Sequence, residues 1–171
     1  MTTRKQVSVL FVCMGNICRS PAAEGVFRDY VEQQSAAGNV HIDSAGTIGY
    51  HSGNPADPRM CEAAARRGYE LTSMSRQVTP EDPEEFDLIV AMDRDNLAEL
   101  KYLAGGPRPH IRLLGSFLPE YQGPQEQAPQ VPDPYYGGLQ GFEVVLDMLE
   151  CACPGIYAAC GELLEQDPGS D

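Results

Sequence analysis

The 171-residue chain is predicted to fold as one α/β domain, with a four-stranded parallel sheet flanked by helices on both faces. Short apolar segments alternate along the chain with segments whose apolar residues recur at helical spacing, which is typical of a βαβ series. A length of 171 residues suits a single core, and the Pro/Gln-rich stretch 119–132 is too short to separate two domains.

The expected strands are short runs rich in residues that favour an extended backbone. They lie at 7–12, 40–45, 87–92 and 110–117. Because helical segments separate them, the connections have room for crossovers, and the strands are expected to run parallel. Ligands in such sheets bind beyond the carboxyl ends of the strands. The residues at the carboxyl ends of three of these strands are expected to share one crevice; they are Cys13, Ser44 to Gly46, and Met92 with Asp93.

Helices are expected where apolar residues recur at the helical period. These segments are 20–37, 56–67, 93–103 and 139–165. Asp57, Pro58 and Arg59, in the sequence NPADPR, are expected to open the second helix, with no catalytic role. Pro154 and Gly155 fall inside the last helix, and we expect them to kink or interrupt it because proline lacks a backbone donor.

Between the first strand and the first helix, the sequence CMGNICRS at 13–20 has the spacing of an anion-binding loop. The residues between Cys13 and Arg19 suffice for backbone N–H groups to curl around one tetrahedral oxyanion, at a helix N-terminus. The arginine fork suits two phosphate oxygens, and the same surroundings favour a thiolate. The sequence therefore predicts a phosphate-binding loop after the first strand, with Cys13 as a nucleophile rather than a buried structural cysteine.

This loop resembles the phosphate-binding loop of the low-molecular-weight protein tyrosine phosphatases. The likeness continues in the family's order through SPAAE at 20–24, IDSAGT at 42–47, NPADPR at 54–59, AMDRDN at 91–96 and DPYYGG at 133–138. The resemblance implies that residues 1–171 form one domain of this family. It also implies hydrolysis of protein phosphotyrosine through a phosphocysteine, without metal or organic cofactor.

Hydrolysis of a phosphate monoester also needs an acid that protonates the leaving oxygen. Asp133 is the candidate: it lies between two prolines that stiffen the backbone, and Gly137 and Gly138 permit a turn after it. An aspartate in such a loop is ordinarily a turn former, but the resemblance assigns the general acid to DPYYGG. Tyr135 and Tyr136 are then expected to flank the cleft and stack on an aromatic leaving group, although exposed loop tyrosines are the commoner case.

The resemblance assigns supporting roles around the loop as well. Asn16 is expected to hold the loop open by bonding neighbouring segments, with Ser44 as its partner, and Ser20 to donate to the Cys13 thiolate. From the sequence alone, N-capping of the first helix by the Ser20 hydroxyl is equally consistent. The rest of the pocket is assigned to Ile48 and Tyr50, opposite the acid loop, and to Met14, Gly15, Ile17 and Cys18.

Two of these pocket residues keep an alternative. Tyr50 suits a phosphotyrosyl ring but is equally consistent with a half-exposed loop residue. Cys18 lies five positions after Cys13 and is either its partner in a protective disulfide after oxidation or a small buried residue at the helix start. The other cysteines are expected to pack helices rather than to bind metal; they are Cys61, Cys151, Cys153 and Cys160.

One position departs from the family pattern. Ser73 precedes Arg76 and Gln77 where many members have a histidine shortly before an Arg-Gln pair. We therefore expect no histidine-mediated link to the loop, a simpler supporting network and a less firmly held loop. The histidines of this chain do not replace the missing one; they are His41, His51 and His110.

The formal net charge of −13 argues against nucleic acid and acidic membrane surfaces as partners. An anionic substrate is attracted only locally, by Arg19, the loop amides and Arg59, so we expect modest substrate affinity at low salt. The acidity of the chain itself favours solubility. No apolar run reaches the ~18 residues of a membrane span, and MTTRKQ leads directly into a strand. We expect a cytoplasmic protein with free thiols, monomeric or weakly homo-oligomeric, that acts on phosphotyrosine-containing proteins.

Three other functions are less consistent with the sequence. Arsenate reductases share the loop and fold but need further cysteines, usually near 80–95, and none lies there. A protein-arginine phosphatase branch has threonine at the position of Ile17, so isoleucine favours the tyrosine branch. A non-hydrolytic phosphate-binding module would be expected to lose Cys13 or Asp133, and both are present.

Overall fold

The computed structural model describes residues 6–34 and 39–166. Its strands form one four-stranded parallel sheet, as predicted, and their order is β2-β1-β3-β4. The strands are β1 (Val7–Cys13), β2 (Val40–Gly46), β3 (Leu88–Ala91) and β4 (Ile111–Leu113). Pairing of β1 with β2 runs from Val7 opposite Val40 to Cys13 opposite Gly46, so the two strands end side by side.

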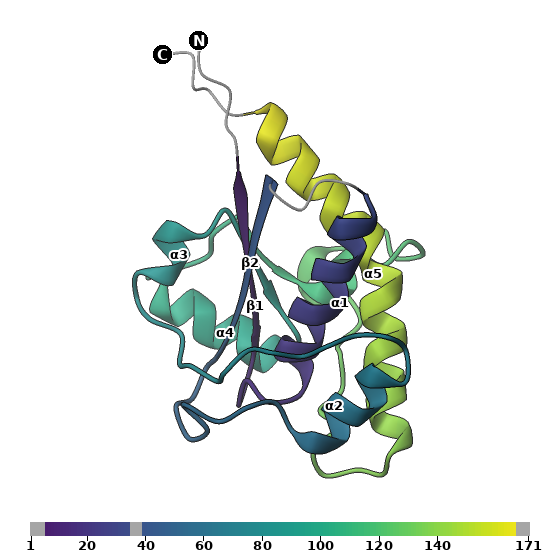
Figure 1. Ribbon diagram of the computed structural model, residues 1–171. Helices are drawn as coiled ribbons and strands as arrows, with labels where there is room; N and C mark the ends of the chain where they lie inside the picture. The colour runs from purple at the N-terminus through teal and green to yellow at the C-terminus, as the bar shows by residue number, and fades with distance from the viewer. Residues whose placement is uncertain (1–5, 35–38, 167–171) are drawn as a thin grey trace.

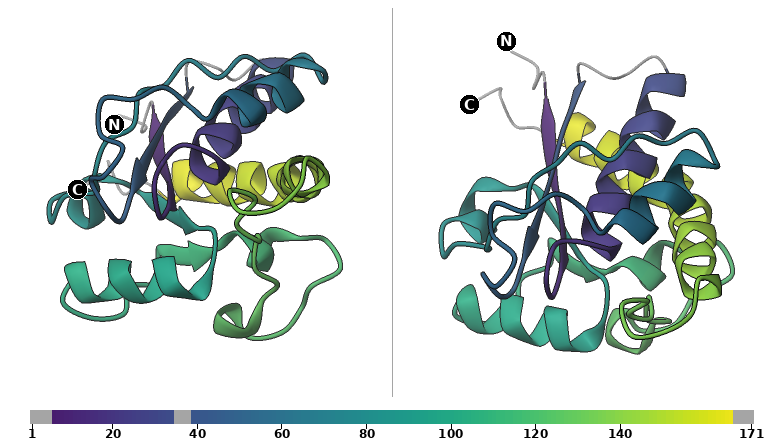
Figure 2. Two further views of the ribbon diagram at one scale, coloured as in Figure 1. Left: turned by 90° about the horizontal axis from the view of Figure 1, so that it is seen from below. Right: turned by 60° about the horizontal axis from the view of Figure 1, so that its bottom comes forward.

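Helices cover both faces of this sheet, as predicted (Figures 1 and 2). They are α1 (Arg19–Gln33), α2 (Pro58–Ala65), α3 (Asp82–Glu85), α4 (Arg94–Leu103) and α5 (Gln140–Glu165). Val9 and Phe11 of β1 belong to the core that includes α1, α2 and α5, whereas Leu10 and Val12 pack with α4. The alternation follows from the two-residue period of a strand, and both faces are apolar because both are covered.

The fourth strand is shorter than expected. The predicted strand 110–117 is extended only over Ile111–Leu113, after which the chain forms the 3₁₀ helix η2 (Leu114–Phe117). The Ser116 hydroxyl donates to the Leu113 carbonyl at 2.7 Å, which supports the turn. A Cβ at Gly115 would lie 1.9 Å from the Pro129 carbonyl oxygen, so only glycine permits this close approach of the segment that leads to the acid loop.

Two helix expectations also need adjustment. The predicted helix 20–37 ends at Gln33, and its expected residues 35–37 lie outside the described residues. The last helix is not interrupted: α5 continues through Pro154 and changes direction along its length (Figure 1). Buried residues on both sides of the proline, including Leu149 and Ile156, anchor the two halves in one core, so a bend suffices.

Helix α5 is long and apolar enough to cross a membrane by length and composition. Its buried side chains pack with those of α1 and the sheet, as in the core helix of a globular domain. Burial raises the pKa of Cys153 and of Cys160 to about 12, so both are neutral packing residues, as expected. Cys61 is partly buried, but Cys151 is exposed, so the expectation that Cys151 packs between helices is wrong.

The segments that follow three strands meet at the lower end of the sheet in Figure 1. After β1 and β2, Thr47 N–H donates to the Cys13 carbonyl at 2.9 Å. After β3, Met92 N–H donates to the Val12 carbonyl at 3.0 Å, and the Met92 carbonyl accepts from Val131 N–H at 2.9 Å. The segment that begins at Val131 is thereby attached to the same edge as the 13–20 loop.

Candidate active site

The loop at 13–20 curls around the sulfur of Cys13. The backbone N–H of Asn16 donates to Cys13 Sγ at 3.2 Å, and Ser20 Oγ lies 3.0 Å from the same atom. Asn16 has φ of +56°, a left-handed conformation that asparagine adopts more readily than most residues. The loop reverses at Asn16, and its backbone thereby points at the sulfur.

The side chain of Asn16 attaches the loop to its surroundings. It is 2% exposed, and its Nδ2 donates to Ser20 Oγ at 2.7 Å and to Ser44 Oγ at 3.1 Å. Its Oδ1 accepts from the backbone N–H of Arg76 at 3.0 Å. Both amide protons are used, which fixes the orientation of the amide and joins the loop to β2 and to the 73–77 segment.

Ser20 lies at the start of α1 but does not cap it. The N-cap position is Cys18, and no side chain there bonds the helix end. The Ser20 hydroxyl instead contacts Cys13 Sγ and Asn16, with the Ala45 carbonyl at 3.4 Å as a further acceptor. The N-capping alternative for Ser20 is therefore wrong, because its hydroxyl is directed at the sulfur side of the loop.

Arg19 is 3% exposed and is held by groups from distant segments. Its Nη1 donates to Asp93 Oδ2 at 2.6 Å and to the Val131 carbonyl at 3.1 Å, while Nη2 lies 3.6 Å from Asp133 Oδ2. Burial disfavours the charged guanidinium, but Cys13 and Asp93 outweigh this effect, and the pKa of Arg19 is raised. Arg19 is therefore a fixed cation between the 13–20 loop and the segment that carries Val131 and Asp133.

Asp133 lies beside this cation on a loop with fewer anchors. Its side chain is 34% exposed, and its Oδ1 accepts from Tyr135 N–H at 3.0 Å, an Asx turn of the kind the sequence indicates. The rings of Tyr135 and Tyr136 meet edge to face with centroids 4.9 Å apart. Arg59, which forms an ion pair with Asp57 at 2.9 Å, also lies over the Tyr135 ring, so α2 supports this loop.

One pocket of about 360 Å³ gathers most of the predicted site residues. It is lined by Cys13, Met14, Gly15, Ile17, Cys18, Arg19, Ile48, Tyr50, Asp133, Tyr135 and Tyr136. The other three predicted residues, Asn16, Ser20 and Ser44, are buried behind the loop and reach the site through hydrogen bonds. Ile48 and Tyr50 form the wall away from β3, and Tyr50 is 84% exposed, beyond the half-exposed state considered from sequence.

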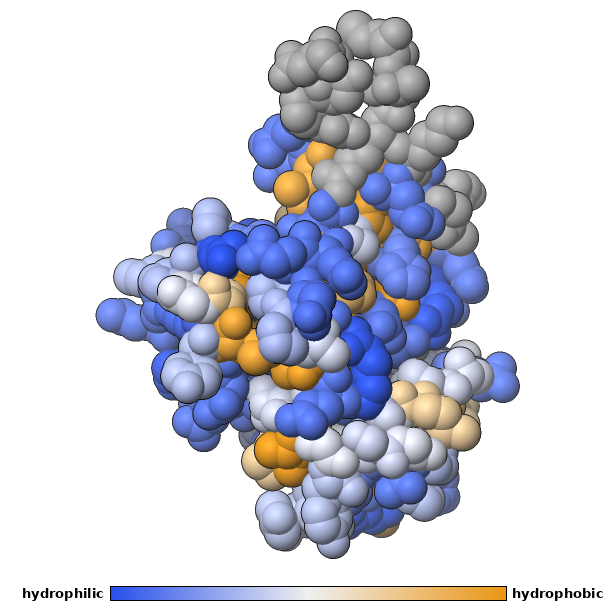
Figure 3. Space-filling model, turned by 90° about the vertical axis from the view of Figure 1, so that its left-hand side faces the viewer, coloured by the Kyte–Doolittle hydropathy of each residue, from blue (hydrophilic) through white to orange (hydrophobic). Residues whose placement is uncertain are grey.

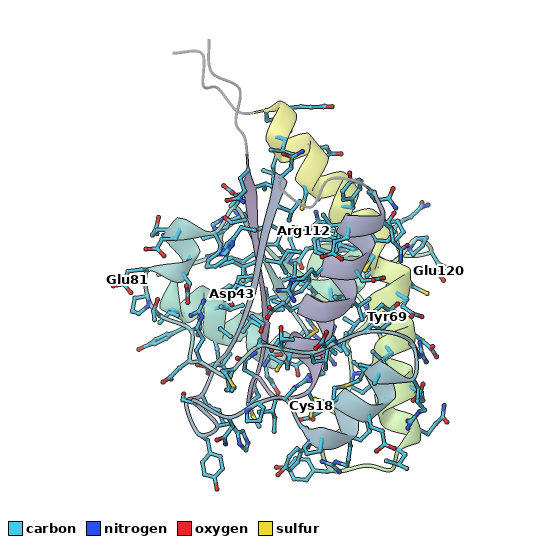
Figure 4. All side chains as sticks on the ribbon, viewed as in Figure 1. Cys18, Asp43, Tyr69, Glu81, Arg112 and Glu120 are labelled. Carbon is cyan, nitrogen blue, oxygen red and sulfur yellow. The ribbon has the colours of Figure 1, made fainter. Side chains whose placement is uncertain are left out.

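Cys18 lines the pocket and lies beside α2 (Figure 4). It is buried, and burial, followed by the carboxylate of Asp57, raises its pKa. The thiol is therefore neutral at neutral pH. Asp57 also ties the start of α2 to the loop, because its backbone N–H donates to the Ile17 carbonyl at 2.7 Å.

Comparison with known proteins agrees with this geometry. The family model described as "Low molecular weight phosphotyrosine protein phosphatase" matches residues 8–166. The chain belongs to this family. A Streptomyces coelicolor low molecular weight protein-tyrosine-phosphatase is 46% identical over 92% of this chain and 95% of its own length. The human low molecular weight phosphotyrosine protein phosphatase is 42% identical over 90% of this chain and 95% of its length.

Solved structures of phosphatases share the fold. A protein tyrosine phosphatase from Entamoeba histolytica, crystallised with Hepes in its active site, has a TM-score of 0.83, is 41% identical and covers 92% of this chain and 98% of its own. YfkJ from Bacillus subtilis has a TM-score of 0.83 at 37% identity, covering 92% and 96%. As a member of this phosphatase family, the protein is an enzyme of the hydrolase class.

The structure adds residues to this phosphatase site that sequence reasoning missed. Asp93 was placed in the crevice without a role, and it holds Arg19. His51 lines the pocket, with its ring 4.8 Å from that of Tyr50 by centroids and 6.4 Å from that of Tyr135. Nothing local marks His51, since its place beside Tyr135 depends on another loop.

The 73–77 segment supports the phosphatase loop without a histidine. Ser75 is buried, and its hydroxyl donates to the Gly15 carbonyl at 3.1 Å. Its neighbour Arg76 donates a backbone N–H to Asn16. The segment therefore contacts the loop through a serine two positions beyond Ser73 and through the backbone of Arg76.

Proposed function

We propose that this protein hydrolyses protein phosphotyrosine in two steps through a phosphocysteine on Cys13. The observation that carries the proposal is the pocket that joins Cys13 at its base, Arg19 at its side and Asp133 at its rim. In the first step, the thiolate attacks phosphorus and the tyrosyl oxygen leaves. In the second step, water attacks the phosphocysteine and releases phosphate.

Charge on the transferring phosphoryl group is stabilised by Arg19 and the loop amides. Because Nη1 is bound by Asp93 and the Val131 carbonyl, the guanidinium plane is set before substrate arrives. Nη2 is directed to the side of the pocket where Asp133 lies. The backbone N–H groups from Met14 to Cys18 supply the remaining donors, and such pre-oriented dipoles act without reorganisation during the reaction.

Asp133 serves first as acid and then as base. Protonated, it delivers its proton to the leaving phenolic oxygen; as the resulting carboxylate, it accepts a proton from the attacking water. Its place 3.6 Å from Arg19 keeps it within reach of the bound phosphoryl group. Neither step calls for a metal or an organic cofactor.

A phosphotyrosyl group fits the walls of the pocket. Tyr50, Tyr135 and Tyr136 surround its rim and offer ring contacts to an aromatic leaving group. A second substrate class is phosphoarginine, because a structure titled drosophila arginine phosphatase is 31% identical over 88% of this chain, with a TM-score of 0.77. Ile17 at the pocket base favours phosphotyrosine, since the arginine-phosphatase branch that the sequence resembles carries threonine there.

We place the protein in the cytoplasm, as a monomer or weak homo-oligomer whose partners are phosphotyrosine proteins rather than nucleic acid or membranes. The face shown in Figure 3 is largely hydrophilic, with apolar side chains in small clusters. A net charge of −13 repels polyanions and supports solubility. Sedimentation across a concentration series tests the oligomeric state.

Cys18 gives the site sensitivity to oxidation. Peroxide converts the Cys13 thiolate to a sulfenic acid and is itself reduced to water. The Cys18 thiol, which is neutral at neutral pH, then gives up its proton as its sulfur attacks the sulfenic sulfur; the displaced hydroxide takes that proton and leaves as water, and a disulfide remains. Both sulfurs lie on the same pocket, and the bond protects Cys13 from irreversible oxidation until a thiol reductant restores it.

One assay tests the catalytic proposal: turnover of phosphotyrosine, phosphoserine and phosphoarginine peptides, with and without chelator. We expect phosphotyrosine to be hydrolysed fastest, phosphoserine to be poor because its short side chain does not reach the loop, and chelator to have no effect. Preference for phosphoarginine would replace the tyrosine assignment, and Ile17→Thr should move selectivity in that direction. Loss of activity with chelator would remove the cofactor-independent mechanism.

A further inference from the structure

A continuous series of hydrogen bonds leads from the nucleophile to a buried carboxylate on α1. Glu24 is 5% exposed, which is uncommon for a glutamate, and its Oε1 accepts from Ser44 Oγ at 2.7 Å. Its Oε2 forms an ion pair with Arg28 one helical turn further on. From Ser44 the series continues through Asn16 and Ser20 to the sulfur of Cys13.

The direction of the bonds follows from two fixed ends, the Glu24 carboxylate and the backbone N–H of Arg76. An ionised carboxyl group only accepts, so the Ser44 proton is directed to Glu24, and Ser44 Oγ is left as an acceptor for Asn16 Nδ2. The Asn16 amide cannot turn over, because its Oδ1 accepts from Arg76 N–H. Its second Nδ2 proton therefore goes to Ser20 Oγ, and the Ser20 hydroxyl keeps one proton to donate.

The remaining proton of Ser20 has two acceptors within reach. Cys13 Sγ lies at 3.0 Å and the Ala45 carbonyl oxygen at 3.4 Å. The sulfur is closer and, as a thiolate, carries the charge, so it takes the bond. A donor at this place favours the thiolate over the thiol, because only the thiolate gains from a hydrogen bond that it accepts.

We propose that Glu24 is a positioning residue, which acts through Ser44 and Asn16 to make Ser20 a hydrogen-bond donor to the Cys13 thiolate. The inference rests on the proposed function, in which that thiolate is the nucleophile. Arg28 contributes by binding Glu24 Oε2, which leaves Oε1 to accept from Ser44. The other titratable groups that line the pocket with Cys13 are Cys18, Arg19, Tyr50, His51, Asp133, Tyr135 and Tyr136, and none of them takes part in this series.

Glu24→Gln tests the direction of the series with almost no change of shape. Arg28 has only protons to offer, so it binds the amide oxygen of the glutamine and turns the NH₂ group towards Ser44. Ser44 Oγ then lies between two N–H donors, the new amide group and Asn16 Nδ2, and no atom of the series is left to accept the Ser44 proton. We expect the pH at which half of Cys13 is alkylation-reactive to rise by about one unit. The kcat/KM for an aryl phosphate should fall about tenfold below that pH and recover above it.

Arg28 supplies the matched rescue. In the Glu24→Gln/Arg28→Ala double variant the amide is free to turn its oxygen to Ser44, so the half-reactive pH should return to that of Arg28→Ala alone. Glu32→Gln, an exposed change on the same helix, controls for lost surface charge. An unchanged half-reactive pH in Glu24→Gln, or the same rise with and without Arg28, would overturn the proposal.

A second variant covers the case that Glu24→Gln does not fold, as judged by circular dichroism and thermal unfolding. Ser44→Ala keeps the carboxylate but breaks the series, and it should raise the half-reactive pH by a similar amount; no rise would overturn the proposal. Alkylation measures the thiolate without turnover. A shift by Glu24→Gln in a protein that fails to hydrolyse phosphotyrosine would therefore support this inference while the proposed function fails.

Discussion

The phosphate-binding loop at 13–20 and the acid loop at 131–138 face each other across one pocket but are built differently. In the first loop, Asn16, Arg19 and Ser20 are at most 3% exposed, and their side chains bond to β2, to the 73–77 segment and to Asp93. In the second, Asp133 is one-third exposed and Tyr136 is 84% exposed. Burial and side-chain anchoring are concentrated on one side of the reaction.

The difference follows from the chemistry assigned to each side. Stabilising the charge of a transferring phosphoryl group requires donors whose positions do not change during reaction, which the anchored loop provides. Donating a proton and later activating water requires a carboxyl group that follows the leaving oxygen and lets substrate enter and phosphate depart. Substitutions on each side of the pocket can test this division.

Replacing the nucleophile should give the largest loss. In Cys13→Ser, a hydroxyl that is scarcely ionised replaces the sulfur at an unchanged position, and we expect kcat to fall by ~10⁴ or more. Steady-state turnover of an aryl phosphate, with thermal unfolding as the control for folding, measures this effect. Residual activity within tenfold of that of the natural protein would rule out the phosphocysteine mechanism. It would also remove the explanation that the anchored loop stabilises a phosphoryl group during transfer to Cys13.

Removing the fixed cation should be nearly as damaging. Arg19→Ala leaves Asp93 and Asp133 without their common partner and deprives the phosphoryl group of its fork, so kcat/KM should fall ~10²–10³-fold. Competitive inhibition by inorganic phosphate should weaken in parallel. Asp93→Asn is the sharper comparison, because it keeps Arg19 but weakens the contact that holds its guanidinium in place. A loss of kcat/KM equal to that of Arg19→Ala would mean that the position of the guanidinium accounts for the whole contribution of Arg19.

The acid loop should show a substrate-dependent loss. Asp133→Asn removes the proton donor, and the loss in kcat should grow towards ~10²-fold as the leaving group becomes more basic, because poor leaving groups need the proton most. A series of substituted phenyl phosphates measures the slope. If all members lose activity equally, Asp133 has a structural task and the acid lies elsewhere.

The serine link should give a moderate effect. Ser75→Ala removes the hydroxyl that holds the Gly15 carbonyl, so loop amides near it should lose alignment and kcat should fall about tenfold. Phosphate affinity should fall by a similar factor. Ser73→Ala, two residues away at the position of the family histidine, is the matched control, and an equal effect of both variants would show that the segment acts only through general stability.

The smallest effect on untreated enzyme concerns Cys18. Because burial raises the pKa of Cys18, its thiolate fraction grows as pH rises above neutrality, and disulfide formation after peroxide should accelerate in the same direction. Mass spectrometry of treated protein should find a Cys13–Cys18 peptide. In Cys18→Ser, recovery on reduction, taken relative to its own untreated activity, should be lost. Sulfinic acid on Cys13 in the natural protein, without a bridged peptide, would return Cys18 to a packing role.

Local spacing was enough to predict that Cys13 and Arg19 share one pocket. Cys13 and Arg19 are six positions apart between a strand and a helix, and the backbone that joins them has few ways to close around an anion. The alternation of apolar and helical segments similarly predicted the parallel sheet, because burial on both faces imposes that pattern on the chain. Asp133 needed the family motif as well, since an aspartate in a Pro/Gly loop has a common structural explanation.

Only the tertiary structure decided what holds these groups in place. Asn16 meets Ser44 across 28 positions, Ser75 meets Gly15 across 60, and Arg19 meets Asp93 across 74. No local pattern marks such partners, because their proximity depends on sheet order and on which segments converge at one edge. The same holds for the end of β4 and the unbroken α5, where packing against neighbouring segments outweighed the local preference of the chain.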